Sequence, residues 1–220
     1  MSLRDQFGPE NLTRDGHAAK MRVRERTLQI IQESDFWVPD GDGFLNGDWV
    51  EMCGEGDETL KMLLSKGVLR PGYGKYIGVN NSPEVIATNR TLFAEEEAAG
   101  LVEWRLGDWA EVTSDFKNLS RVRVVVFDHF IALHNEQISN IIRDCTDLAE
   151  YLLGTNGAVL LMLNFSLYAQ SRDPSRIQRY EKSLQVWKNE VCPSNRTPME
   201  SCTYTSKRIP MLPVWVPLGF

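Results

Sequence analysis

Stretches with the pattern of buried strands alternate with stretches of helical periodicity along this chain, and this alternation most constrains the fold. Val122–Phe127 and Ala158–Leu163 are mainly apolar, as strands buried on both faces of a sheet are. Further strands are expected at residues 49–53, 75–79 and 101–106. Strands that alternate with helices predict a parallel α/β sheet with helices packed on its faces.

Helical periodicity supplies the connecting elements. Residues 15–34 are expected to form a helix with Met21, Leu28 and Ile31 on its apolar face. Ser82-Pro83 is typical of a helix start, because serine caps the first turn and proline fits the first helical position. The apolar side of that helix is expected to contain five residues: Val85, Ile86, Asn89, Leu92 and Phe93. Helices are also expected near residues 138–152 and 173–191.

The end of the chain changes character. Tyr204–Ile209 and Val214–Leu218 are expected to be two strands joined around Pro210 and Pro213. No helix separates them, which predicts an antiparallel hairpin at a sheet edge, where prolines are tolerated.

One domain is expected, because 220 residues of which 42% are hydrophobic suffice for one core. Within residues 1–220 we expect four parts. They are an N-terminal helical extension or lid (1–40), a core of alternating strands and helices (48–163), a helical insertion (164–199) and a terminal strand hairpin (200–220).

Charge and cysteine content disfavour several classes of protein. The net charge of -6 disfavours broad nucleic-acid binding, which needs a basic surface. The four cysteines form no C-x-x-C pair and no Cys/His cluster, so neither a disulfide scaffold nor a metal site is expected. Reduced thiols fit a cytoplasmic protein. No apolar run is long enough to span a bilayer, and the first ten residues lack the apolar core of a signal peptide.

Two basic segments, residues 14–26 and 172–188, lie outside the expected core. They are either solvated helix faces or parts of a local anion site. An anion site would favour an anionic small acceptor.

A short acidic segment, Glu51-Met52-Cys53-Gly54-Glu55-Gly56-Asp57-Glu58, joins the first expected strand to its helix. Ligands of doubly wound sheets bind at such carboxyl ends of strands, and glycines let the backbone approach them closely. An ordinary tight turn has the same glycines. The acidic side chains would repel a pyrophosphate at the helix N-terminus, and the P-loop Lys-[Ser/Thr] is missing. The segment therefore favours S-adenosylmethionine (SAM), which has a positive sulfonium and amine and no phosphate, over NAD.

Four segments in this order resemble motifs of the class I SAM-dependent methyltransferases. They are residues 50–56, 76–84, 106–109 and 125–134, and the resemblance covers about residues 49–163. It implies a Rossmann-like three-layer sandwich, with a mostly parallel seven-stranded sheet and a C-terminal antiparallel hairpin. It also implies SAM as the cofactor, bound by the core at 48–163.

The resemblance assigns roles to individual residues. Glu51 would bind the methionine amine, and Asp108 would accept a hydrogen bond from the adenine amine. Trp109 would stack on adenine or fill the core. His129 would be a general base or simply a packed side chain. The implied cofactor-binding residues are Glu51, Met52, Cys53, Gly54, Gly56, Asn80, Asn81, Gly107, Asp108, Trp109 and Asp128.

Two departures from the family pattern bear on activity. The first loop glycine is replaced by Met52 or Cys53, and Asn80 stands where the family has an acid that holds both ribose hydroxyls. On this basis Asn80→Asp is expected to tighten SAM binding.

The main prediction is a methyltransferase acting on a small-molecule acceptor. The alternatives are a SAM-binding protein without catalysis that has an interaction role, and an NAD-linked oxidoreductase, which the acidic loop disfavours.

Overall fold

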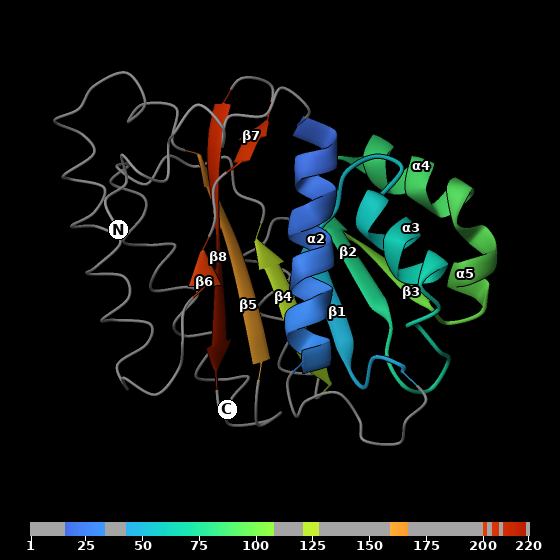
Figure 1. Cartoon of the computed structure of the whole chain (residues 1–220). Coiled ribbons are helices and arrows are strands. Elements are labelled where there is room, and N and C mark those ends of the chain that lie inside the picture. The colour runs from blue at the N-terminus through green and yellow to red at the C-terminus, as the bar shows by residue number, and fades with distance from the viewer. Residues whose placement is uncertain are drawn as a thin grey trace, which may run out of the picture.

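The computed structural model describes residues 16–33, 43–107, 121–127, 159–166, 200–201, 204–206 and 209–218. Its centre is a parallel sheet of five strands in the order β3-β2-β1-β4-β5 (Figure 1). The strands are β1 (Asp48–Met52), β2 (Tyr76–Asn80), β3 (Val102–Leu106), β4 (Val122–Phe127) and β5 (Val159–Ser166). Strand order changes direction between β1 and β4, and ligands of this type of sheet bind at that point. The predicted α/β class and parallel sheet are confirmed.

The C-terminal strands continue the sheet beyond β5. β8 (Ile209–Leu218) lies antiparallel to β5, and β6 (Glu200–Ser201) and β7 (Tyr204–Ser206) both pair with β8. The expected junction at Pro210 and Pro213 is wrong, because both prolines lie inside β8. Proline removes one N–H donor but still fits an extended chain. The described residues contribute eight strands, so the expected count of seven is not confirmed; the hairpin stays a prediction, since residues 207 and 208 are outside the description.

Local sequence signals place the helices. Ser82 caps its helix by accepting a hydrogen bond from the Val85 amide, and Pro83 occupies the first turn, as predicted. Asp57 caps the preceding helix in the same way, by accepting from the Leu60 amide. The described helices are α2 (Gly16–Glu33), α3 (Glu58–Ser65), α4 (Pro83–Leu92) and α5 (Ala94–Ala98).

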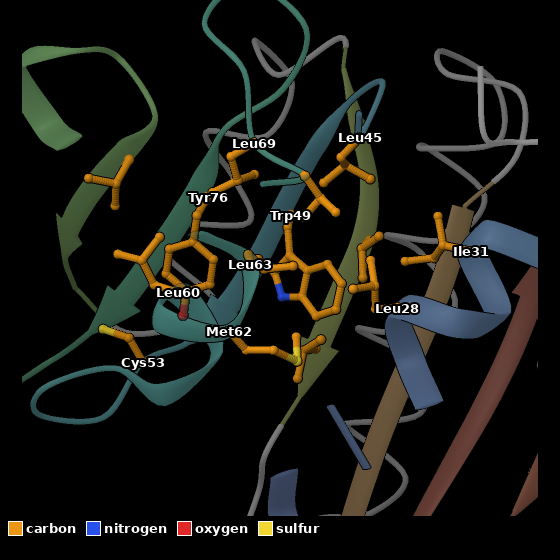
Figure 2. Close-up of a cluster of buried hydrophobic side chains, with 14 of the residues drawn as sticks. Leu28, Ile31, Leu45, Trp49, Cys53, Leu60, Met62, Leu63, Leu69 and Tyr76 are labelled. Atoms are coloured by element: carbon orange, nitrogen blue, oxygen red, sulfur yellow. The ribbon is translucent and has the colours of Figure 1, made fainter. Parts of the chain in front are cut away.

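One face of the sheet packs against these helices. Figure 2 shows Leu28 and Ile31 of α2 directed toward Trp49 of β1, with Leu60 and Leu63 of α3 beside them. All five side chains are at most 4% exposed. The other face is buried too, through Val50, Ile77, Val125 and Leu161. A sheet buried on both faces is what the apolar strands predicted.

A close approach joins β2 and β3. Gly78 pairs in register with Trp104, and a Cβ atom on Gly78 would lie 2.4 Å from the Trp104 ring. The absent side chain therefore leaves the space that the indole fills. Phe93 covers the same indole, with ring centroids 5.7 Å apart.

Helix α4 buries a narrower stripe than expected. Ile86, Asn89 and Phe93 are buried, whereas Leu92 is 58% exposed. The expectation for Leu92 is wrong, because a stripe through positions 86, 89 and 93 already faces the sheet and position 92 lies to its side.

Candidate functional site

The candidate site is the loop of residues 53–56, which follows β1 and leads into α3. The Cys53 amide donates to the Val79 carbonyl at 3.0 Å, so the loop starts beside the end of β2. Gly56 has a φ of 65°, a left-handed conformation that favours glycine. The loop therefore lies at the carboxyl end of the central strand, where the sequence placed the ligand.

Two asparagine amides hold the loop backbone. Asn80 donates from Nδ2 to the Cys53 carbonyl at 2.7 Å and accepts the Ser82 amide at Oδ1 at 2.8 Å. Asn89, which is fully buried on α4, donates from Nδ2 to the Gly54 carbonyl at 2.9 Å. Its Oδ1 accepts the Gly56 amide at 2.8 Å. Three backbone groups of the loop thus have side-chain partners from β2 and α4.

The outer surface of the loop is open at Gly54. This glycine is exposed, and a Cβ atom built on it meets no other atom within 4 Å. Glu55, the next residue, is also exposed. The loop therefore presents bare backbone and one carboxylate to its surroundings.

A buried pair of acids, Glu51 and Asp57, lies beneath the loop. Glu51 is 4% exposed, and its carboxyl oxygens accept hydrogen bonds from Trp49 Nε1 at 3.0 Å and Thr59 Oγ1 at 2.9 Å. Asp57 accepts the Tyr76 hydroxyl at Oδ2 at 2.8 Å. These bonds tie the end of β1 to the start of α3 and to β2.

Burial changes the acidity of this region. Burial, followed by the nearby Asp57 carboxyl, raises the pKa of Glu51 to about 8, although the Arg24 guanidinium of α2 partly opposes this rise. Burial likewise raises the pKa of Asp57 above its usual value. The pKa of the Cys53 thiol is raised to about 12, first by burial and then by the two acids. Cys53 is therefore a protonated thiol at neutral pH and a poor nucleophile.

The structure brings together the predicted residues that it describes. Met52 ends β1, and the Gly107 amide donates to the Asn80 carbonyl at 3.1 Å, so Gly107 lies beside the end of β2. Asn81 is exposed next to Asn80. The contact expected between Glu51 and a methionine amine stays a prediction. In the structure, both carboxyl oxygens of Glu51 have hydrogen-bond partners inside the protein. Four predicted residues lie outside the described residues: Asp108, Trp109, Asp128 and His129.

The sequence interpretation missed two side chains that support the loop region. Asn89 was expected only as part of a helix face, although an amide among Ile86 and Phe93 signals a buried polar contact. Asp57 was expected to make the loop surface acidic, but its carboxyl is buried. Glu58 hydrogen-bonds Lys61 at 2.9 Å. Of the three acids expected to repel a pyrophosphate, Glu55 is the one whose side chain is exposed.

Within the described ranges, no group of three or more His, Cys, Asp or Glu side chains is arranged to hold a metal ion. In the same part of the chain, no helix combines the length and apolar character needed to cross a bilayer.

No protein-family model matches the sequence, and neither does any curated protein sequence. Solved structures do match in fold. The O-methyltransferase TomG from Streptomyces achromogenes, solved with SAM, is 12% identical over 99% of this chain and 97% of its own, with a TM-score of 0.51. The plantazolicin methyltransferase BamL, solved with S-adenosylhomocysteine (SAH), is 10% identical over 92% of this chain and 88% of its own, with a TM-score of 0.53.

The methyltransferase domain of METTL16 is 8% identical, with a TM-score of 0.54; the match covers 90% of this chain and 66% of that domain. Identities this low show the fold alone. The strand order β3-β2-β1-β4-β5, the loop after β1 and these matches together show that the chain has the fold of the class I SAM-dependent methyltransferases.

Proposed function

We propose that this chain is a SAM-dependent methyltransferase that acts on a small-molecule acceptor. The observation that carries the proposal is the loop of residues 53–56. It follows the central strand, it is held by two amides, and its backbone is open at Gly54. Backbone without side chains at the carboxyl end of a central strand is suited to a ligand that must approach closely.

The surroundings of the loop fit SAM. Leu92 and Leu106 are the large apolar side chains most exposed among the described residues, at 58% and 56%. Leu106 ends β3, and Leu92 lies 3.9 Å from the position of a Cβ atom on Gly56. Exposed apolar groups beside polar backbone suit a ligand with both a ring and charged ends. The exposed Glu55 carboxylate favours the positive charges of SAM.

Several roles follow from the family resemblance and remain part of the proposal. Glu51 would bind the methionine amine of the cofactor. The other residues proposed to border it from the described part of the chain are Met52, Cys53, Gly54, Gly56, Asn80, Asn81 and Gly107. Asp108 and Trp109 would contact adenine, and Asp128 would lie near the methyl donor. When bound, SAM supplies an activated methyl group that passes to an acceptor lone pair and leaves SAH. His129 would take a proton from an acceptor that must lose one.

The acceptor is proposed to be a small molecule. The net charge of -6 opposes recognition of nucleic acid. An anionic acceptor would need free basic groups, yet Arg26 pairs with Glu33 at 3.1 Å and Arg24 lies close enough to the buried acids to lower their pKa. These contacts engage Arg24 and Arg26, whereas Arg22 of the same helix is exposed. Residues 172–188, the second basic segment, lie outside the described residues.

The finer layout is part of this proposal. It comprises a seven-stranded sheet with a terminal hairpin, and the division into a lid (1–40), a SAM-binding core (48–163), an insertion (164–199) and the hairpin (200–220). A cytoplasmic location is proposed from the cysteine spacing, which includes no C-x-x-C pair and no Cys/His cluster.

A second candidate is a SAM-binding protein without catalysis. It is favoured by Asn80, whose amide is engaged with the loop backbone instead of offering the acceptor pair of a carboxylate.

Calorimetry on the full chain tests these candidates. Titration with SAM and SAH is expected to give saturable binding, and NADH is expected to give none. Binding of NADH alone would overturn the proposal. If SAM binds, incubation with methyl-labelled SAM and a panel of small acceptors separates the candidates, since label transfer requires an active enzyme.

A further inference from the structure

We propose that Asn80 and Asn89 form an asparagine clamp, a pair of positioning residues that fixes the loop of residues 53–56 in the shape that receives the cofactor. The inference rests on the proposed function for its binding step. It assigns to Asn80 a role that differs from ribose recognition, and it adds Asn89, which the family resemblance did not indicate.

The clamp supplies partners that the backbone does not. Buried or half-buried peptide groups need hydrogen bonds, and a turn between a strand and a helix leaves several unpaired. Here the carbonyls of Cys53 and Gly54 and the amide of Gly56 find them in the two side-chain amides, at 2.7, 2.9 and 2.8 Å. The side chains of the protein itself thereby hold the loop in shape.

Only an amide satisfies each position. Asn89 both donates and accepts, and so does Asn80, whereas a carboxylate at neutral pH only accepts. A carboxylate at position 80 would place an oxygen where Nδ2 now lies, 2.7 Å from the Cys53 carbonyl oxygen. Two acceptors at that distance repel each other. The amide at position 80 is therefore a requirement of the loop, and not a weakened form of a ribose ligand.

Both clamp residues belong to one short segment. Asn80 ends β2, and its Oδ1 accepts the amide of Ser82, the residue that caps α4. Asn89 lies two turns further along the same helix. Hydrogen bonds thus hold the loop against both β2 and α4. The exposed backbone of Gly54 lies on the side of the loop that faces away from the protein. Binding energy for the cofactor is not spent on ordering the loop.

The test compares Asn89→Leu with Ile86→Ala in the full chain. Asn89→Leu removes both clamp bonds of that residue at similar size. Ile86→Ala removes buried packing from the same helix and no hydrogen bond to the loop. Two quantities are measured at a temperature where both variants are folded: hydrogen exchange of the Gly56 amide in the free protein, by NMR, and the Kd for SAH, by calorimetry.

Asn89→Leu is expected to speed Gly56 exchange by about tenfold and to weaken SAH binding by about tenfold. Ile86→Ala is expected to lower the melting temperature and leave both quantities near wild type. If Asn89→Leu does not fold, Asn80→Ser, at a half-exposed position, removes the bond to Cys53 and is expected to weaken SAH binding in the same way.

The outcomes separate the clamp from the proposed function. Wild-type protein that does not bind SAH overturns the proposed function, while Gly56 exchange still tests the clamp. A folded Asn89→Leu protein with a protected Gly56 amide and wild-type SAH affinity overturns the clamp alone.

Discussion

The hydroxyl of Tyr76 donates a 2.8 Å hydrogen bond to Asp57 Oδ2, while the other oxygen of that carboxyl caps α3 by accepting the Leu60 amide. One buried carboxyl therefore joins the second strand to the first turn of the helix that follows the first strand. The same carboxyl lies under the candidate cofactor loop, so changes here act on stability and on the site together.

Removal of the Tyr76 hydroxyl is expected to destabilise the fold. Tyr76→Phe leaves a buried Asp57 oxygen without its partner, which typically costs about 1–3 kcal/mol. Urea unfolding followed by circular dichroism measures the loss. Tyr73→Phe is the matched control, since Tyr73 is half-buried, and we expect a much smaller change there. Equal losses in both variants would contradict the role given to this bond.

The raised pKa of Glu51 predicts a pH dependence of stability. The pKa rises from its usual 4.5 in the unfolded chain to about 8 in the folded protein, mainly through burial. Between these values the folded protein holds a proton that the unfolded chain has released, so stability falls as pH rises from about 4.5 to about 8 and then levels off. One proton corresponds to about 1.4 kcal/mol per pH unit.

Glu51→Gln is expected to flatten that fall, because an amide does not titrate. Melting temperatures from about pH 5 to about pH 9, a range that covers most of the expected fall, measure it. The raised pKa of Asp57 leaves a residual slope of the same sign. Glu58→Gln, near the helix start, is the control and should keep the wild-type profile. A Glu51→Gln profile identical to wild type would show that Glu51 is ionised in the folded protein.

The two loop glycines are expected to respond differently to a side chain. A Cβ atom on Gly54 meets no atom within 4 Å, so Gly54→Val is expected to leave stability near wild type. SAH affinity should fall on the order of tenfold, because the side chain enters the ligand's space. Gly56→Val must adopt a φ of 65°, which costs roughly 1–2 kcal/mol or more. Thermal melts and calorimetry on both variants separate the effects. Unchanged SAH affinity in Gly54→Val would move the ligand away from this loop.

Asn80→Asp is expected to weaken SAH binding, the reverse of what the family pattern alone predicts. The new carboxylate would face the Cys53 carbonyl in place of a donor. Asn46→Asp adds the same charge at an exposed position before β1 and controls for net charge. Calorimetry on both proteins decides, and tighter binding by Asn80→Asp would restore the ribose role of this position.

Features of the fold that leave a local pattern in the sequence were predicted correctly. The apolar run at Val122–Phe127 and the Ser82-Pro83 start gave the strand and the helix boundary correctly, because burial on both faces and capping leave local patterns. The position of the glycine loop followed from the same alternation of elements.

The side-chain contacts that support the site could not be predicted from the sequence. Asn89 bonds residues that lie 33 and 35 positions away, and Asp57 bonds Tyr76 from 19 positions away. A single sequence shows a polar residue in an apolar stripe but not its partner, which depends on how β1, β2 and α4 pack. For the same reason the outward position of Leu92 was missed.

The fit between Gly78 and Trp104 constrains how this chain can change over evolutionary time. Any side chain at position 78 would overlap the indole, with even a methyl group only 2.4 Å from it. Truncation of Trp104 alone would instead leave a void between β2, β3 and α4. A substitution at either position is therefore tolerated only when the other position also changes. We expect the two residues to vary together among descendants of this sequence, with a larger side chain at position 78 accompanied by a smaller one at position 104.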